Sequence, residues 1–125
     1  MLYTPGHTTD SVSLWDKASG IVFSGDYLYP ADLYAFLPNS SMQDYLATSE
    51  SLLESLPRGV VFFGAHRTGP PGAPRQGMSN LVDLNRSLES IRDKTTSGEG
   101  VYPQVFRVND EMVILAEPRW LQDWD

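Results

Sequence analysis

Residues 60–66 read VVFFGAH, an apolar run of four residues that ends in two small residues and a histidine. A short apolar run rich in valine and phenylalanine indicates a strand buried in a sheet. Residues 21–26 read IVFSGD and repeat the arrangement, with Asp26 in the place of His66. The two segments predict a layered α/β protein in which both polar side chains emerge where strands end, the usual place for sites in such folds.

A third segment with a metal-ligand type of side chain lies near the start of the chain. Residues 4–8 read TPGHT and place His7 in a Pro-Gly turn just before a predicted strand. His7 and His66 are the only histidines, and there is no cysteine, so a bound metal would be held by histidine and carboxylate groups. Each segment alone has an ordinary interpretation, as a turn or a surface histidine. Together, His7, Asp26 and His66 are the candidate metal ligands.

The remaining pattern predicts two hairpins and two helices. Residues 11–15 and 21–23 flank a turn, and residues 105–108 and 112–115 flank another at 109–111. Ser41 with Asp44 three residues later predicts the start of a helix that ends at residues 57–59. Ser79 or Asn80 is expected to cap a second helix, which ends at residues 95–98. Residues 64–77 hold three prolines and four glycines, which predicts a long loop, and residues 120–125 form an aromatic, acidic tail.

Composition narrows the class of protein. A chain of 125 residues, 41% hydrophobic and 20% charged, fits one soluble globular domain over residues 1–125. A formal net charge of −7 opposes binding to nucleic acids and to anionic membranes. We find no signal peptide and no apolar stretch long enough to span a membrane, so a cytoplasmic location is the default expectation.

The three segments, in this order and in this strand context, resemble the C-terminal half of the metallo-β-lactamase-fold superfamily, over about residues 3–91. The superfamily includes thioesterases of the glyoxalase II type, lactonases, ribonucleases and β-lactamases. The resemblance implies that His7 ligates a first metal ion, that Asp26 bridges two ions and that His66 ligates the second. It also implies hydrolysis of an ester, thioester, lactone, amide or phosphodiester by a metal-activated water, with zinc as the expected metal and iron or manganese as alternatives.

The sequence departs from the superfamily pattern in one respect. The N-terminal motif His-x-His-x-Asp-His, which supplies most of the ligands, is absent. A catalytic zinc normally has three protein ligands, so the isolated chain is expected to bind metal weakly and to be inactive. The expected fold is half of an αββα sandwich, a mainly antiparallel sheet with two helices on one face, and its apolar strands would expose Ile21, Phe23, Val61 and Phe63.

Three interpretations follow from this departure. The first is a metal-dependent hydrolase module that a homodimer or a complementing N-terminal half completes. The second is a non-catalytic, homo-oligomeric binding or assembly module with a vestigial metal site. The third is the product of a truncated gene. In the first case Arg67 and Arg75, which flank the long loop, are candidates for orienting an anionic substrate.

Overall fold

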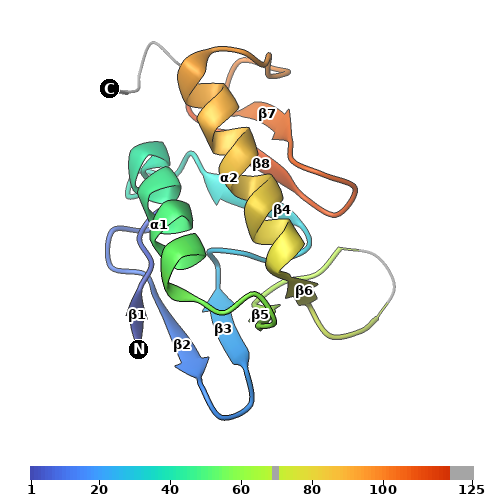
Figure 1. Cartoon of the computed structure of the whole chain (residues 1–125). Coiled ribbons are helices and arrows are strands. Elements are labelled where there is room, and N and C mark those ends of the chain that lie inside the picture. The colour runs from blue at the N-terminus through green and yellow to red at the C-terminus, as the bar shows by residue number, and fades with distance from the viewer. Residues whose placement is uncertain (69–70, 119–125) are drawn as a thin grey trace.

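The computed structural model describes residues 1–68 and 71–118, which form two sheets and a layer of two helices (Figure 1). In chain order the elements are β1 (Leu2–Tyr3), β2 (Val12–Asp16), β3 (Ile21–Gly25), β4 (Asp32–Ala35), α1 (Met42–Ser55), β5 (Val61–Gly64), β6 (Arg75–Gly77), α2 (Met78–Asp93), β7 (Gln104–Arg107) and β8 (Val113–Ala116). The predicted mixed α/β class, with two helices on one face of the sheets, is confirmed.

The larger sheet contains five strands in the order β1-β2-β3-β5-β6. The predicted hairpin of β2 and β3 is antiparallel, with Leu14 opposite Phe23. β3 and β5 are parallel, and Phe23 lies opposite Phe63. Parallel neighbours need a crossover connection, which α1 supplies here. The apolar runs at residues 21–23 and 60–63 therefore belong to adjacent strands, and the C-terminal ends of these strands lie at the same edge of the sheet.

The smaller sheet contains three strands in the order β4-β8-β7. The predicted hairpin of β7 and β8 is confirmed, with Val105 opposite Leu115. β4 pairs with β8 in parallel, and Tyr34 lies opposite Leu115. The smaller sheet thus pairs β4, which follows the Asp26 turn, with β8, the last strand that the structure describes.

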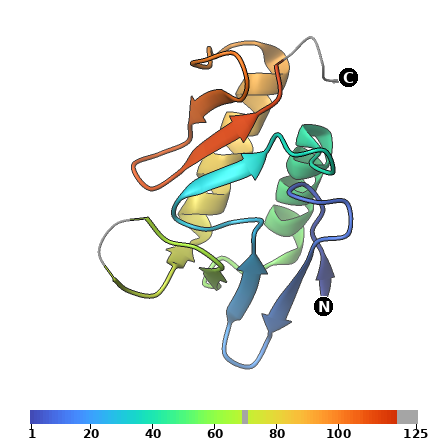
Figure 2. The same cartoon turned by 180° about the vertical axis from the view of Figure 1, so that it is seen from behind.

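Both helices lie on the same side of the two sheets (Figures 1 and 2). α1 begins as predicted, because the Ser41 side chain accepts a hydrogen bond of 3.1 Å from the Asp44 backbone N–H. The buried face of each helix contacts strand residues with no exposed surface, among them Val22, Phe62 and Ile114. Within residues 1–68 and 71–118, no helix is long and apolar enough to cross a membrane.

Four local features of the structure differ from the expectation: the strands β1, β4 and β6, and the cap of α2. β1 and β4 were not predicted, and β6 lies inside the segment predicted as one long loop, where it pairs with β5. The prediction that Ser79 or Asn80 caps α2 is wrong. The helix begins at Met78 with Gly77 as its cap, because Gly77 is the last residue of β6 and that strand runs directly into the helix. The predicted acidic tail at residues 120–125 lies outside the described residues.

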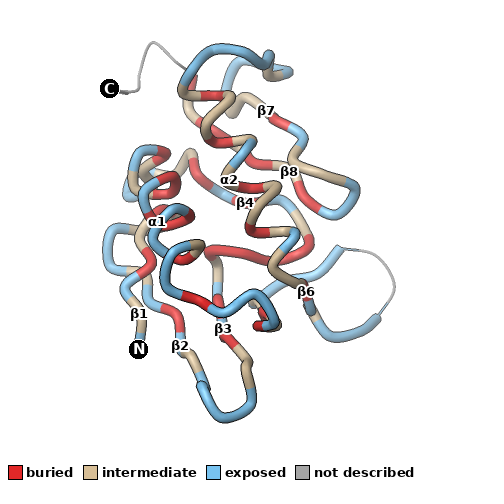
Figure 3. Tube along the Cα trace, in the orientation of Figure 1, coloured by how far each residue is buried: buried red, intermediate tan, exposed pale blue. Residues whose placement is uncertain are grey.

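The face of the larger sheet turned away from the helices carries an apolar patch that the described residues leave partly uncovered. Along the strands of this sheet, buried residues alternate with exposed and half-buried ones (Figure 3). Leu14 is 54% exposed and Phe23 is 49% exposed. Ile21, Val61 and Phe63 are half-buried on the same face. We call these five residues the open face. The exposure predicted from sequence is found for Phe23, whereas Ile21, Val61 and Phe63 are less exposed than predicted.

Candidate metal centre

Asp26 and His66 meet because the ends of two parallel strands are tied together. Gly25 ends β3 with φ +55°, a left-handed conformation that glycine adopts without steric cost, and the chain turns there. The Ala65 N–H donates a 2.8 Å hydrogen bond to the Gly25 carbonyl. The residues that follow are therefore neighbours, and His66 Nε2 lies 2.7 Å from Asp26 Oδ1.

A close approach at the end of β5 also positions His66. A Cβ atom on Gly64 would lie 2.4 Å from the Leu28 carbonyl oxygen and 2.4 Å from the Tyr29 Cβ, so only glycine fits there without a shift. The edge of the Tyr29 ring contacts the His66 ring, with 5.1 Å between the centroids. The segment after Asp26 thus contacts both the strand that delivers His66 and the imidazole itself.

The turn that carries His7 is held against the start of α1. Gly6 has φ +153°, and a Cβ there would meet the ring of Tyr45 at 2.6 Å. The Gly6 carbonyl accepts a 2.8 Å hydrogen bond from the Ser41 N–H. The Thr48 hydroxyl donates to the Pro5 carbonyl at 2.7 Å. The helix therefore fixes the backbone of the turn that the Pro-Gly pair predicted.

The orientation of the His7 imidazole follows from its backbone partner. His7 Nδ1 lies 2.9 Å from the Tyr34 carbonyl oxygen, which can only accept a hydrogen bond, so Nδ1 carries the proton. In the neutral ring Nε2 then has a free lone pair, and it faces Asp26 Oδ2 at 3.8 Å. A second hydrogen bond that fixes the tautomer in this way is a common feature of metal-ligating histidines. The His7 side chain is 18% exposed, so its orientation is also held by packing.

The donor atoms fit two partial metal positions. Asp26 presents one carboxylate oxygen to each imidazole. Nitrogen and carboxylate donors suit zinc, iron or manganese. Within residues 1–68 and 71–118, however, no group of three or more histidine, cysteine, aspartate or glutamate side chains is arranged to hold one ion. His7, Asp26 and His66 are thus brought together, and each position has one histidine and a share of one carboxylate.

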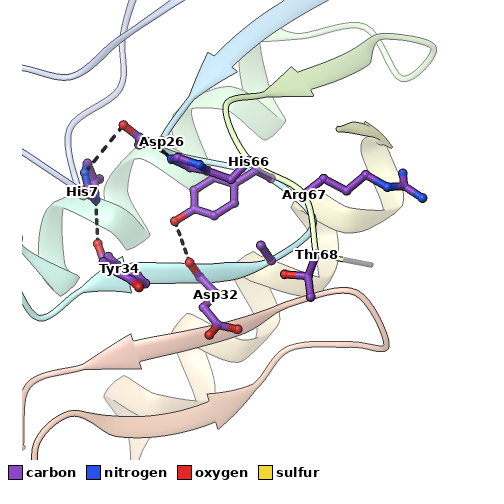
Figure 4. Close-up of a pocket in the computed structure, with 9 residues that line it drawn as sticks. His7, Asp26, Asp32, Tyr34, His66, Arg67 and Thr68 are labelled. Atoms are coloured by element: carbon purple, nitrogen blue, oxygen red, sulfur yellow. Dashed lines mark hydrogen bonds and ion pairs between the residues drawn. The ribbon is translucent and has the colours of Figure 1, made fainter. Parts of the chain in front are cut away.

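A cavity of about 360 Å³ opens over these side chains (Figure 4). The residues that line it are His7, Asp26, Tyr29, Ala31, Asp32, Tyr34, His66, Arg67 and Thr68. Arg67, a candidate for orienting an anionic substrate, therefore borders the cavity. Arg75 lies in β6 opposite Phe63 and, among the described residues, is not part of the lining.

The sequence reasoning missed the tyrosines of this cavity. Tyr29 and Tyr34 belong to the segment between the Asp26 turn and α1, which was left unassigned. The sequence signal for β4 is weak, a single leucine between Asp32 and Tyr34. In the structure Leu33 is buried and these two neighbours are exposed. Burial raises the pKa of Tyr29 to about 12, so its hydroxyl stays neutral and donates a 2.6 Å hydrogen bond to the Asp32 carbonyl.

The chain is similar in sequence to a known family and to curated proteins. The family model described as the metallo-beta-lactamase superfamily matches residues 1–66. The acyl-coenzyme A thioesterase MBLAC2 of Homo sapiens is 43% identical to the chain over 49% of the chain and 22% of the relative. The protein of the same name from Gallus gallus is 34% identical over 80% of the chain and 41% of the relative. The chain therefore spans less than half the length of the curated relatives it matches.

A solved structure shares this fold, which confirms the predicted half of a metallo-β-lactamase fold. The crystal structure of a metallo-beta-lactamase from Staphylococcus aureus subsp. aureus COL superposes with a TM-score of 0.52. It is 21% identical and is matched over 82% of this chain and 36% of that chain. At this identity the likeness concerns the fold alone.

Proposed function

The chain belongs to the metallo-beta-lactamase superfamily, a hydrolase-like family, and we propose that it supplies one part of a two-metal site that hydrolyses thioesters. The observation that carries the proposal is the meeting of His7 and His66 at the two carboxylate oxygens of Asp26. The thioester class is supported by the relatives from human and chicken, which are both named as acyl-coenzyme A thioesterases. The ester and lactone classes share the same carbonyl chemistry and are the nearest alternatives.

Each residue of the site has a distinct role in this proposal. His7 Nε2 would hold a first ion, His66 Nε2 would hold a second, and the Asp26 carboxylate, which has one oxygen near each imidazole, would contribute to both. The Tyr34 carbonyl keeps His7 in the tautomer that can ligate, and the Tyr29 ring limits rotation of His66. Metal ions bound there would act as Lewis acids on the scissile carbonyl and lower the pKa of the attacking water.

A second polypeptide is expected to complete the site. The described residues offer fewer than three ligands for either ion, whereas a catalytic zinc normally has three. The open face supports the same conclusion, because exposed apolar patches of this kind mark surfaces that another chain covers. We propose that the partner is either a second copy of this chain or a complementing polypeptide that carries the remaining ligands.

Metal content and mass, measured on one purified sample, test the proposal. We expect zinc to bind the wild-type protein, and the zinc content to fall in His7→Ala and in His66→Ala. Glu54→Gln, which alters an exposed carboxylate on α1, is the control that should change neither the zinc content nor the mass. A protein that binds no zinc at stoichiometric concentration, in a monomer or in a complex, would contradict the metal role.

The alternative function is a non-catalytic binding or assembly module. It is favoured by the partial ligand set, which a vestigial site would also show. Mass measurement combined with metal analysis separates the two functions. An assembled protein without zinc, whose assembly is unaffected by Asp26→Asn, supports the module, whereas zinc bound only by the assembled form supports the hydrolase site.

A further inference from the structure

The outer face of the smaller sheet carries a row of apolar side chains. The register of the three strands places Tyr34, Leu115 and Val105 side by side. Their neighbours along the strands, such as Leu33 and Ile114, point into the helix-covered core and have no exposed surface. Tyr34 is 42% exposed, and the other two are half-buried. With a strand spacing of about 4.8 Å, the row is about 10 Å long.

Two further rings extend this row. The Phe36 ring contacts that of Tyr34, with centroids 5.6 Å apart, and the Tyr102 ring contacts Phe36 edge-on at 5.9 Å. The Tyr102 hydroxyl donates to the Phe36 carbonyl at 3.3 Å. We call Tyr34, Phe36, Tyr102, Val105 and Leu115 the aromatic platform. Although it is built from segments far apart in the sequence, its members contact one another or pair across the sheet.

The aromatic platform begins at the candidate metal centre. Tyr34 lines the cavity that holds His7, Asp26 and His66, and its carbonyl accepts from His7. Figure 4 shows Tyr34 and Arg67 on opposite sides of His66. A molecule whose reacting group lies at Asp26 can therefore extend in two directions, over the platform or past Arg67.

Charge distinguishes these two directions. A second cavity of about 500 Å³ adjoins the first through Ala31, Asp32 and Thr68, and Val105 of the platform also lines it. Its other acidic residues are Glu99, Asp110 and Glu111, and the arginine among its described lining residues, Arg107, is paired with Asp110. A phosphate-bearing group would be repelled there, whereas an uncharged chain would not. Arg67 is the one arginine or lysine among the described residues that line the first cavity, so the direction past Arg67 suits an anionic group.

We infer that the aromatic platform binds the apolar acyl chain of the thioester, while the anionic leaving group extends past Arg67. The inference rests on the proposed thioester substrate. An alkyl chain on an open surface contacts protein on one side, so about half of its surface is removed from water. Full burial of a methylene raises affinity about four-fold, so we expect about a two-fold gain for each methylene.

Binding of S-alkyl coenzyme A thioethers tests the inference, because these compounds resemble the substrate and cannot be hydrolysed as thioesters. Isothermal titration with the butyl, hexyl and octyl compounds, in the presence of EDTA, is expected to show about sixteen-fold tighter binding of octyl than of butyl. Tyr102→Ser, at a residue that is 58% exposed, and Leu115→Asn should reduce this ratio to about four-fold or less. The octyl-to-butyl ratio is taken within each variant, so a general loss of affinity does not change it.

A matched control and four contrary results make the test decisive. Leu14→Ser removes an equally exposed apolar side chain from the open face and should preserve the dependence on chain length. If no compound binds, if the wild type shows no such dependence, or if Tyr102→Ser retains it while Leu14→Ser loses it, the inference is wrong. A wild-type dimer that Tyr102→Ser dissociates would instead make the platform a subunit interface, which also overturns it. Because EDTA is present, a failure of the metal proposal leaves this result unaffected.

Discussion

Gly64→Ala is expected to separate His66 from Asp26 without touching either side chain. The added Cβ would lie 2.4 Å from the Leu28 carbonyl oxygen and from the Tyr29 Cβ, while ordinary contact begins near 3.4 Å. The strand end must therefore shift by about 1 Å, because the obstructing atoms belong to backbone or lie next to it and cannot rotate away. Overpacking of this kind costs about 1–3 kcal/mol of unfolding free energy. His66 follows two residues later, so we also expect zinc affinity to fall about ten- to hundred-fold.

Urea unfolding and competitive zinc titration measure the two effects separately. Gly59→Ala is the matched control, because its Cβ would meet nothing within 4 Å. It should change the unfolding free energy by no more than about 0.5 kcal/mol. An unchanged urea midpoint in Gly64→Ala would refute the steric argument. A lower midpoint with unchanged zinc affinity would show that Leu28 moves instead, and would refute the link between Gly64 and the position of His66.

Three further predictions address the site and the fold. Asp26→Asn should weaken zinc binding at least about ten-fold, because both imidazoles face its carboxylate; competition with a chelator measures this, and unchanged affinity would exclude Asp26 as a ligand. Ser41→Ala should lower the unfolding free energy by about 1 kcal/mol through loss of the helix cap, and an unchanged urea midpoint would contradict the capping role. Burial raises the pKa of Tyr29 to about 12 and the pKa of Tyr27 and of Tyr45 well above 10. The unfolded chain ionises near 10, so stability should be complete below that pH and fall above it by about 1.4 kcal/mol per pH unit for each tyrosine. Urea unfolding at pH 9 and 11 with equal midpoints would disprove this.

The parts of the fold that were predictable from sequence are those with a strong local pattern. Both hairpins and both helices follow from alternation and from helical spacing, and the cap at Ser41 follows from its partner three residues later. β4 was missed because it is short and pairs with a strand about eighty residues away, so no local pattern reports its partner. Asn80 was misread as a cap because its side chain instead bonds with Asn109, a contact that only the tertiary fold creates.

The candidate site shows the same division between local and long-range information. Strand-end positions for Asp26 and His66 could be predicted, because each follows an apolar run. The contact between Asp26 and His66 depends on the parallel pairing of β3 and β5. The similarity of the two apolar runs does not by itself establish that pairing. The carbonyl of Tyr34, which fixes the His7 tautomer, could not be predicted at all, since backbone partners of a side chain leave no trace in its residue type.

The partial ligand set and the open face have one common explanation. A polypeptide that covers Leu14 and Phe23 would pack against the sheet whose strand ends carry Asp26 and His66. Its own strand ends could then supply the donors that each metal position lacks. The apolar contact and the metal ligation would stabilise the same assembly, since an ion that binds only the completed site adds its binding free energy to the association. Zinc should therefore tighten the assembly, and Asp26→Asn should remove that effect while leaving the zinc-free association through the open face unchanged.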